Sequence, residues 1–335
     1  MDESLVAASM ASASWNRHSS ALRSYKKFAI LTGQISSMPF TIESVRKYTT
    51  WALKNQKLGL DTVKVYLSDF KLAHKLRNLP THFENDFFIK LMLKGAKNLS
   101  LYNDICKPAK FVMSYHLLMI LGHEIAKSNW ETDSKNVFWT ACCVAFFGSF
   151  RLGEILSTHE EGGKVETLKW NQVQFTTKNS AILNIKFPKI VKNVKGDFVD
   201  LFKIENCTCC PFSALRKLAN SHQDLVTTNH PVFSFKNGSL LTTKKFTEKV
   251  QKLLYQHIGQ AAFQISGHSF RAGIPAALAN NPDLASDHEI MIWGRWSSET
   301  YKVYTRLKHE AKFSIFQKII SMYKPMLCPD HTIPD

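Results

Sequence analysis

The period of the hydrophobic pattern changes along this chain, and that change restricts the folds it can adopt. Apolar residues recur at helical spacing through the N-terminal third, for example in the segment 15–31. From Val165 the period becomes two, and helical spacing returns at Pro211. An alternating pattern predicts strands, here over residues 165–175, 181–187 and 197–202. A turn at Lys195-Gly196-Asp197 would join the last two strands, so we predict an α+β fold, mostly α, with a small antiparallel sheet.

The predicted helices fall into two groups. The first covers residues 15–31, 44–53, a segment from near Asp61, and 87–97, with Thr41 as a candidate N-cap. Helical spacing stops over 100–108, where Asn103, Asp104 and Pro108 are typical of a connecting segment. A chain of 335 residues is long enough for two domains. We therefore predict a helical domain over 1–102, a linker over 103–112 and a second domain over 113–335, whose helices cover 114–126, 137–147, 244–258, 270–280, 287–293 and 308–322.

The charge of the chain indicates its class of partner. Lysine and arginine number 43 against 27 aspartates and glutamates, which gives a formal net charge of +16. A positive excess of this size favours binding to a polyanion such as nucleic acid. The alternative is a basic protein with no nucleic-acid role, in which each lysine or arginine belongs to a solvated helix face.

The cysteines predict neither a disulfide framework nor a metal site. Cys142 and Cys143 lie within an apolar run, as buried thiols do, and the cluster Cys207, Cys209 and Cys210 has no second pair nearby. We therefore expect no metal, no cofactor and a reducing compartment. The longest apolar stretch, residues 137–150, is interrupted and too short for a membrane span, and we expect no secretory signal.

Four short segments carry residue types suited to attack on a phosphodiester without a metal. They are Arg151 in Ser-Phe-Arg-Leu-Gly-Glu, His268 and Arg271 in Gly-His-Ser-Phe-Arg, Trp296 in Trp-Gly-Arg-Trp, and Tyr304 in Tyr-Thr-Arg. A tyrosine phenolate is a nucleophile, and arginine forks match the geometry of a phosphate whose charge is rising.

The surroundings of these residues sharpen the prediction. His268 and Arg271 are three residues apart at a helix start that Ser266 or Gly267 caps, which would place both on one face near free backbone amides. Glu154 is placed to brace Arg151; the alternative is a structural Arg151–Glu154 salt bridge that binds no ligand.

A lysine in the segment between the last two predicted strands is the candidate general acid. Lys189 follows Pro188 at a strand end, and Lys192 and Lys195 lie further along the same hairpin. A lysine on such a hairpin can protonate a leaving 5′ oxygen. The three lysines compete for this role, and any of them can instead be an exposed turn lysine.

Taken together, the motifs resemble those of the tyrosine recombinase/integrase family, with a Cre-type catalytic domain. The sequence is most similar to recombinases of eukaryotic Crypton- and DIRS-type mobile elements in Gly294-Arg295-Trp296-Ser297-Ser298-Glu299. Tyr301 lies one helical turn before Tyr304 and is the alternative nucleophile. The resemblance assigns the family's catalytic set to Arg151, Lys189, His268, Arg271, Trp296 and Tyr304.

The resemblance implies a function and partners. It implies a core-binding N-terminal domain, a catalytic C-terminal domain, and site-specific recombination through a 3′-phosphotyrosine intermediate, for a mobile element. The implied partners are a double-stranded recombination site, with single-stranded or folded DNA as an alternative, and further copies of the chain in a dimer or tetramer on DNA. The expected location is the nucleus in a eukaryote, otherwise the cytoplasm or nucleoid. The rival hypotheses are a type IB topoisomerase-like enzyme and a catalytically idle DNA-binding derivative.

Overall fold

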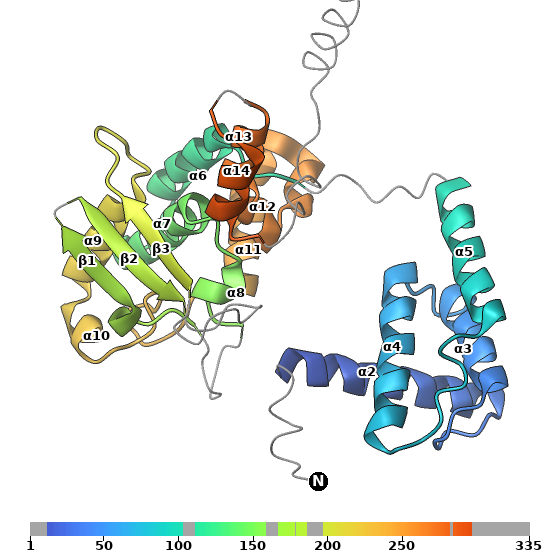
Figure 1. Cartoon of the computed structure of the whole chain (residues 1–335). Coiled ribbons are helices and arrows are strands. Elements are labelled where there is room, and N and C mark those ends of the chain that lie inside the picture. Colours follow the sequence, from blue (N-terminus) through green and yellow to red (C-terminus); the bar gives the residue numbers. More distant parts are fainter. Residues whose placement is uncertain are drawn as a thin grey trace, which may run out of the picture. The chain divides into compact units, whose positions relative to one another are not determined.

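The computed structural model divides the chain into two compact units, residues 1–108 and 109–335 (Figure 1). It describes residues 12–102, 111–158, 167–177, 179–185, 197–281 and 284–296. Most of the predicted linker over 103–112 and the predicted helix over 308–322 lie outside the described residues.

The first unit consists of helices whose positions agree with the helical periodicity of the sequence. They are α2 (Ser12–Thr32), α3 (Ile42–Lys54), α4 (Leu60–Leu76) and α5 (Phe87–Tyr102). Thr41 is the N-cap of α3, as predicted, because its hydroxyl accepts a hydrogen bond of 3.1 Å from the Ser44 N–H.

An aromatic cluster forms the core of this unit. Tyr25 of α2 stacks on Phe40 with ring centroids 3.8 Å apart, and Tyr48 and Phe70 pack edge-on against each other. All four side chains are buried. Aromatic pairs in these arrangements contribute about 0.5–1.5 kcal/mol beyond the burial of their surface, so the cluster fixes how the helices of this unit pack.

The second unit is built around one buried helix, α7 (Thr132–Phe147). Residues 140–146 of α7 are all buried, including Cys142 and Cys143 as the sequence predicts. The other helices of this unit are α6 (Tyr115–Lys127), α8 (Leu152–Ile155), α9 (Pro211–Ser221), α10 (Gln223–Thr227), α11 (Thr243–Ile258), α12 (Gly267–Arg271), α13 (Gly273–Ala279) and α14 (Asp287–Gly294). Helices α6, α9, α12 and α13 pack against α7, with the sheet on one side and α12 to α14 on the other (Figure 1).

The predicted antiparallel sheet is present. Its strands β1 (Val173–Thr177), β2 (Ser180–Ile185) and β3 (Asp197–Phe202) lie in the order β1-β2-β3, both pairs antiparallel. Leu183 of β2 is opposite Val173 and Val199. Alternate residues of β2 are buried, which is why its sequence alternates.

The first strand begins later than its sequence pattern predicts. Trp170–Gln172 forms a 3₁₀ turn, and only then does β1 start. Leu168 and Trp170 are buried because their side chains belong to the hydrophobic core, while their backbones pair with the loop near Pro231, where the Val232 N–H donates to the Leu168 carbonyl at 2.9 Å. Val165 lies outside the described residues.

The predicted helix over 270–280 is two helices. α12 ends at Arg271 and α13 begins at Gly273. Pro275 has no N–H, so the helical bond to the Arg271 carbonyl cannot form, and this permits the break. Gly273 then passes close to the core, because a Cβ there would lie 2.4 Å from Phe146 Cε2 and 2.8 Å from the Met113 carbonyl oxygen.

Two further findings concern the cysteines and the membrane. The Cys210 thiol caps α9 by accepting from the Ser213 N–H at 3.4 Å, and the Sγ atoms of Cys207 and Cys209 are 3.1 Å apart. Within the described ranges, no three or more histidine, cysteine, aspartate or glutamate residues are grouped to hold a metal ion. In the part of the chain that the structure describes, none of the helices has the length and apolar character needed to cross a membrane.

Candidate active site

Arg151 is presented by a tight turn at the end of α7. The turn passes through Ser149, a buried residue with φ of +46°, and then through buried Phe150. Arg151 precedes α8 and is about one quarter exposed. Its backbone N–H donates to Glu154 Oε2 at 2.9 Å and its Nη1 donates to Glu154 Oε1 at 2.8 Å. The Arg151–Glu154 contact that the sequence suggested is therefore present, as both the bracing role and a purely structural salt bridge require.

Arg271 is held rigidly by backbone carbonyls. Its side chain is only 2 % exposed. Nη1 donates to the Ser149 carbonyl at 2.8 Å and Nη2 donates to the Gly294 carbonyl at 2.5 Å. A buried guanidinium needs such partners, and these two fix its fork in one orientation. Arg271 therefore connects the turn before α8 to the end of α14.

His268 and Arg271 share α12 but have different surroundings. Ser266 is the N-cap, and its N–H donates to the Ser269 hydroxyl at 3.0 Å, in agreement with one of the two predicted caps. His268 is exposed, whereas Arg271 is buried. Helix α12 is a little over one turn long, so its first residues face solvent while its last turn packs against the Ser149 turn.

Trp296 lies against Arg271. The Arg271 guanidinium carbon is 5.2 Å from the centroid of the Trp296 ring, within the range of a cation–π contact. The indole packs on Gly294, because a Cβ at that position would lie 2.2 Å from Cε3 and Cζ3 of the ring. Only glycine at 294 lets the indole approach this closely.

One buried carboxylate stands among the arginines. Burial raises the pKa of Glu154, but the charges of Arg295 and Arg271 and hydrogen bonds from Arg295 and Arg151 outweigh it, so the pKa lies below its ordinary value. The Arg295 Nη2 is 2.8 Å from Glu154 Oε2, and Arg271 Nη1 is 4.0 Å from the same oxygen. Glu154 is therefore ionised; it accepts hydrogen bonds from Arg151 and Arg295 and lies at 4.0 Å from Arg271.

The structure thus brings together three of the residues that the sequence singled out. Arg151, Arg271 and Trp296 come from three separate segments: Arg151 and Arg271 lie at Glu154, and Trp296 packs against Arg271. His268, the fourth described candidate, lies exposed at the start of α12. The two remaining catalytic candidates, Lys189 and Tyr304, lie outside the described residues, as do the alternatives Lys192, Lys195 and Tyr301.

Sequence reasoning assigned no role to Arg295. The available signal was a second arginine directly before Trp296. Nothing in that local pattern showed that its side chain returns to Glu154, 141 residues earlier in the chain.

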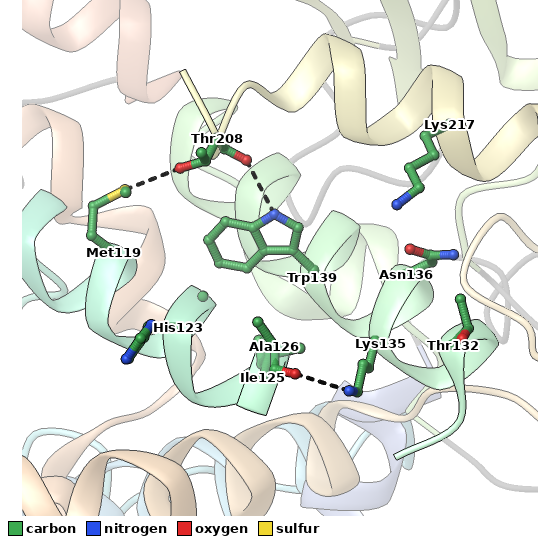
Figure 2. A pocket seen from close by; sticks show the side chains of 11 residues that line it. Met119, His123, Ile125, Ala126, Thr132, Lys135, Asn136, Trp139, Thr208 and Lys217 are labelled. Atoms are coloured by element: carbon green, nitrogen blue, oxygen red, sulfur yellow. Dashed lines mark hydrogen bonds between the residues drawn. The ribbon is translucent and has the colours of Figure 1, made fainter. Parts of the chain in front are cut away.

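A separate pocket lies between α6, α7 and α9 (Figure 2). Its volume is about 560 Å³, and its lining includes Met119, Lys135, Trp139 and Lys217. The Trp139 indole forms a wall and donates to the Thr208 carbonyl at 3.3 Å. The arginine cluster consists of Arg151, Arg271 and Arg295 together with Glu154. None of the residues that line this pocket belongs to the arginine cluster, so the pocket is not the candidate active site.

Comparison with known proteins identifies the fold. The sequence matches no family model and shows no significant match to a curated protein. A structure of the XerH site-specific recombinase in a post-cleavage complex with palindromic difH substrate has a TM-score of 0.58 and 14 % identity, covering 91 % of this chain and 77 % of that one. A structure of the Tn1549 transposon integrase with transposon right-end DNA has a TM-score of 0.53 and 12 % identity, covering 89 % and 99 %. The chain therefore has the fold of the tyrosine recombinases.

Proposed function

We propose that this protein is a site-specific DNA recombinase that cuts and rejoins DNA through a tyrosine, and that it serves a mobile element. The observation that carries the proposal is the convergence of Arg151 and Arg271 on one buried carboxylate, with Trp296 packed against Arg271. Their setting is a fold shared with recombinases that were solved on DNA. The excess of positive charge supports DNA as the partner.

In the proposed reaction, Tyr304 attacks the scissile phosphate. A bond forms between the phenolic oxygen and phosphorus, and the bond from phosphorus to the 5′ oxygen breaks. The phosphate remains attached to the enzyme through a 3′-phosphotyrosyl bond, and attack by another 5′-hydroxyl reverses the step. The bond energy is conserved in the adduct, so no ATP is needed.

The other residues stabilise charge and move protons. Arg151 and Arg271 hold the phosphate oxygens with forks that are already oriented, and the Trp296 indole N–H adds a third donor. His268 is exposed at the start of α12, where it assists loss of the tyrosine proton. Lys189 protonates the leaving 5′ oxygen. We further propose that the protein acts as a dimer or tetramer on double-stranded DNA.

Covalent capture of DNA tests this function. Because the target sequence is unknown, the substrate is a pool of randomised duplexes with a nick near the centre, from which the fragment after cleavage diffuses away. The wild-type protein should form a denaturant-resistant adduct, and Tyr304→Phe should form none while still binding DNA.

Tyr301→Phe is the matched control for this experiment. It should trap DNA as the wild type does. If Tyr301→Phe is the inactive variant instead, the nucleophile is Tyr301. If the wild-type protein yields no adduct from any sequence but binds DNA, the recombinase proposal is wrong and the protein is a DNA-binding derivative.

A further inference from the structure

Arg295 occupies a backbone position where arginine is an unusual choice. It follows the last residue of α14 and has φ of +52° and ψ of 45°, the left-handed conformation. Its N–H donates to the Ile292 carbonyl at 3.0 Å and ends the helix. Helices that end this way most often use glycine, since other L-residues are strained there. A long charged side chain at this position therefore needs a compensating interaction.

The compensating interaction is with the arginine cluster. The Arg295 side chain is 14 % exposed, and its Nη2 is 2.8 Å from Glu154 Oε2. Its guanidinium lies 4.8 Å from the centroid of the Phe150 ring. The Nε is buried and, among the described residues, has no hydrogen-bond partner. A guanidinium this deeply placed needs a counter-charge, and Glu154 supplies it.

Glu154 divides its two oxygens between the arginines around it. Oε1 accepts from Arg151 Nη1, and Oε2 accepts from the Arg151 N–H and from Arg295 Nη2. Arg271 is at 4.0 Å, beyond hydrogen-bond distance, and instead donates to two carbonyls. The charged groups that face Glu154 are Arg151 from its own turn, Arg271 from α12 and Arg295 from the end of α14. One negative charge, on Glu154, thus lies close to three positively charged guanidinium groups.

We propose that Arg295 is a positioning residue for strand cleavage. By occupying Oε2 it satisfies the buried carboxylate, so that Arg271 is not drawn onto Glu154 and Arg151 keeps part of its fork for the phosphate. It also ties the turn that carries Trp296 to the turn that carries Arg151. This inference rests on the proposed recombinase function, because it concerns the same phosphate site.

Removing Arg295 should change the protonation of Glu154. Burial favours the neutral acid, and Arg295 is the largest influence that opposes burial. Without Arg295 the pKa of Glu154 should therefore rise. A neutral Glu154 holds Arg151 less well. In a plot of cleavage rate against pH, the fall of the rate at low pH (the acid limb) should therefore begin at a higher pH. A purely structural defect would lower the rate without moving this limb.

Two substitutions separate the charge of Arg295 from its backbone role. Arg295→Gly removes the side chain and suits the left-handed backbone, so the helix end should be preserved. Arg295→Lys keeps a positive charge. Arg216→Ala is the matched control, because Arg216 also stacks on an aromatic ring, 4.2 Å from the centroid of Phe175, away from the cluster.

The readout is single-turnover covalent capture of a nicked duplex recovered from the randomised pool, from about pH 3.5 to about pH 9, so that the range includes the titration of Glu154 in the wild type. Arg295→Gly should slow capture by about 10²-fold, as loss of a preorganised charge does, with DNA affinity nearly unchanged. The acid limb of Arg295→Gly should move to higher pH by about one unit. Arg295→Lys should restore much of the capture rate and move the acid limb most of the way back. Arg216→Ala should match the wild type.

The inference is overturned if Arg295→Gly captures DNA like the wild type, or if it loses rate equally at every pH and lysine restores nothing. If the wild-type protein forms no adduct, the proposed function fails, and thermal melting then tests the inference. Arg295→Gly should lower the melting temperature less in a Glu154→Gln background than in the wild type. Equal losses in both backgrounds would show that Arg295 does not act through Glu154.

Discussion

Gly294→Ala should impair catalysis while leaving the fold intact. The Cβ of the alanine would lie 2.2 Å from Cε3 and Cζ3 of Trp296. Carbon atoms in contact normally stand about 3.5–4.0 Å apart, so the indole must move by about 1.5 Å. Trp296 is partly exposed and can move outward, away from Arg271. The backbone at Gly294 is helical and has no positive φ, so alanine can adopt it.

The displaced indole determines the expected magnitude. A shift of about 1 Å in a catalytic group can cost about 10²-fold in rate, so covalent capture by Gly294→Ala should fall about that far. Capture on the nicked duplex and melting by circular dichroism are measured side by side. The control is Gly95→Ala, since Gly95 is also helical but a Cβ there meets nothing within 4 Å. Capture within a few-fold of wild type by Gly294→Ala would refute the argument that the indole must rest on Gly294.

Two further predictions concern stability. Gly273→Ala should destabilise the second unit by about 1–3 kcal/mol, because its Cβ would lie 2.4 Å from the buried Phe146 ring and 2.8 Å from the Met113 carbonyl. An unchanged denaturation midpoint in urea would contradict this. Glu154 has a lowered pKa in the folded protein, so its stabilisation is complete above its ordinary pKa of 4.5 and is lost as the pH falls through the folded value. Below about pH 4.5, the melting temperature of Glu154→Gln should therefore depend less on pH than that of the wild type. An identical pH dependence of the two proteins would show that ionised Glu154 does not stabilise the fold.

The amino-acid sequence by itself determined most of the local structure. Helical spacing and turn residues predicted most of the described helices of both units, the N-cap at Thr41, and a cap at Ser266 or Gly267, of which the structure uses Ser266, because these depend on neighbours a few residues away. Alternation predicted the antiparallel sheet, although buried Leu168 and Trp170 resembled strand residues while their backbones pair with a loop instead. Residue types and their order also identified Arg151, Arg271 and Trp296 as one candidate site.

Only the tertiary structure decided how that site is held together. The carbonyls that fix Arg271 belong to Ser149, 122 residues away in the chain, and to Gly294, 23 residues away. Arg295 and Glu154 meet across 141 residues. Contacts of this kind depend on how α7, α12 and α14 pack, and neither hydrophobic period nor motif spacing encodes that packing locally. The sequence could therefore single out the side chains that are candidates to bind a phosphate, while the folded chain determined which carboxylate and which backbone oxygens orient them.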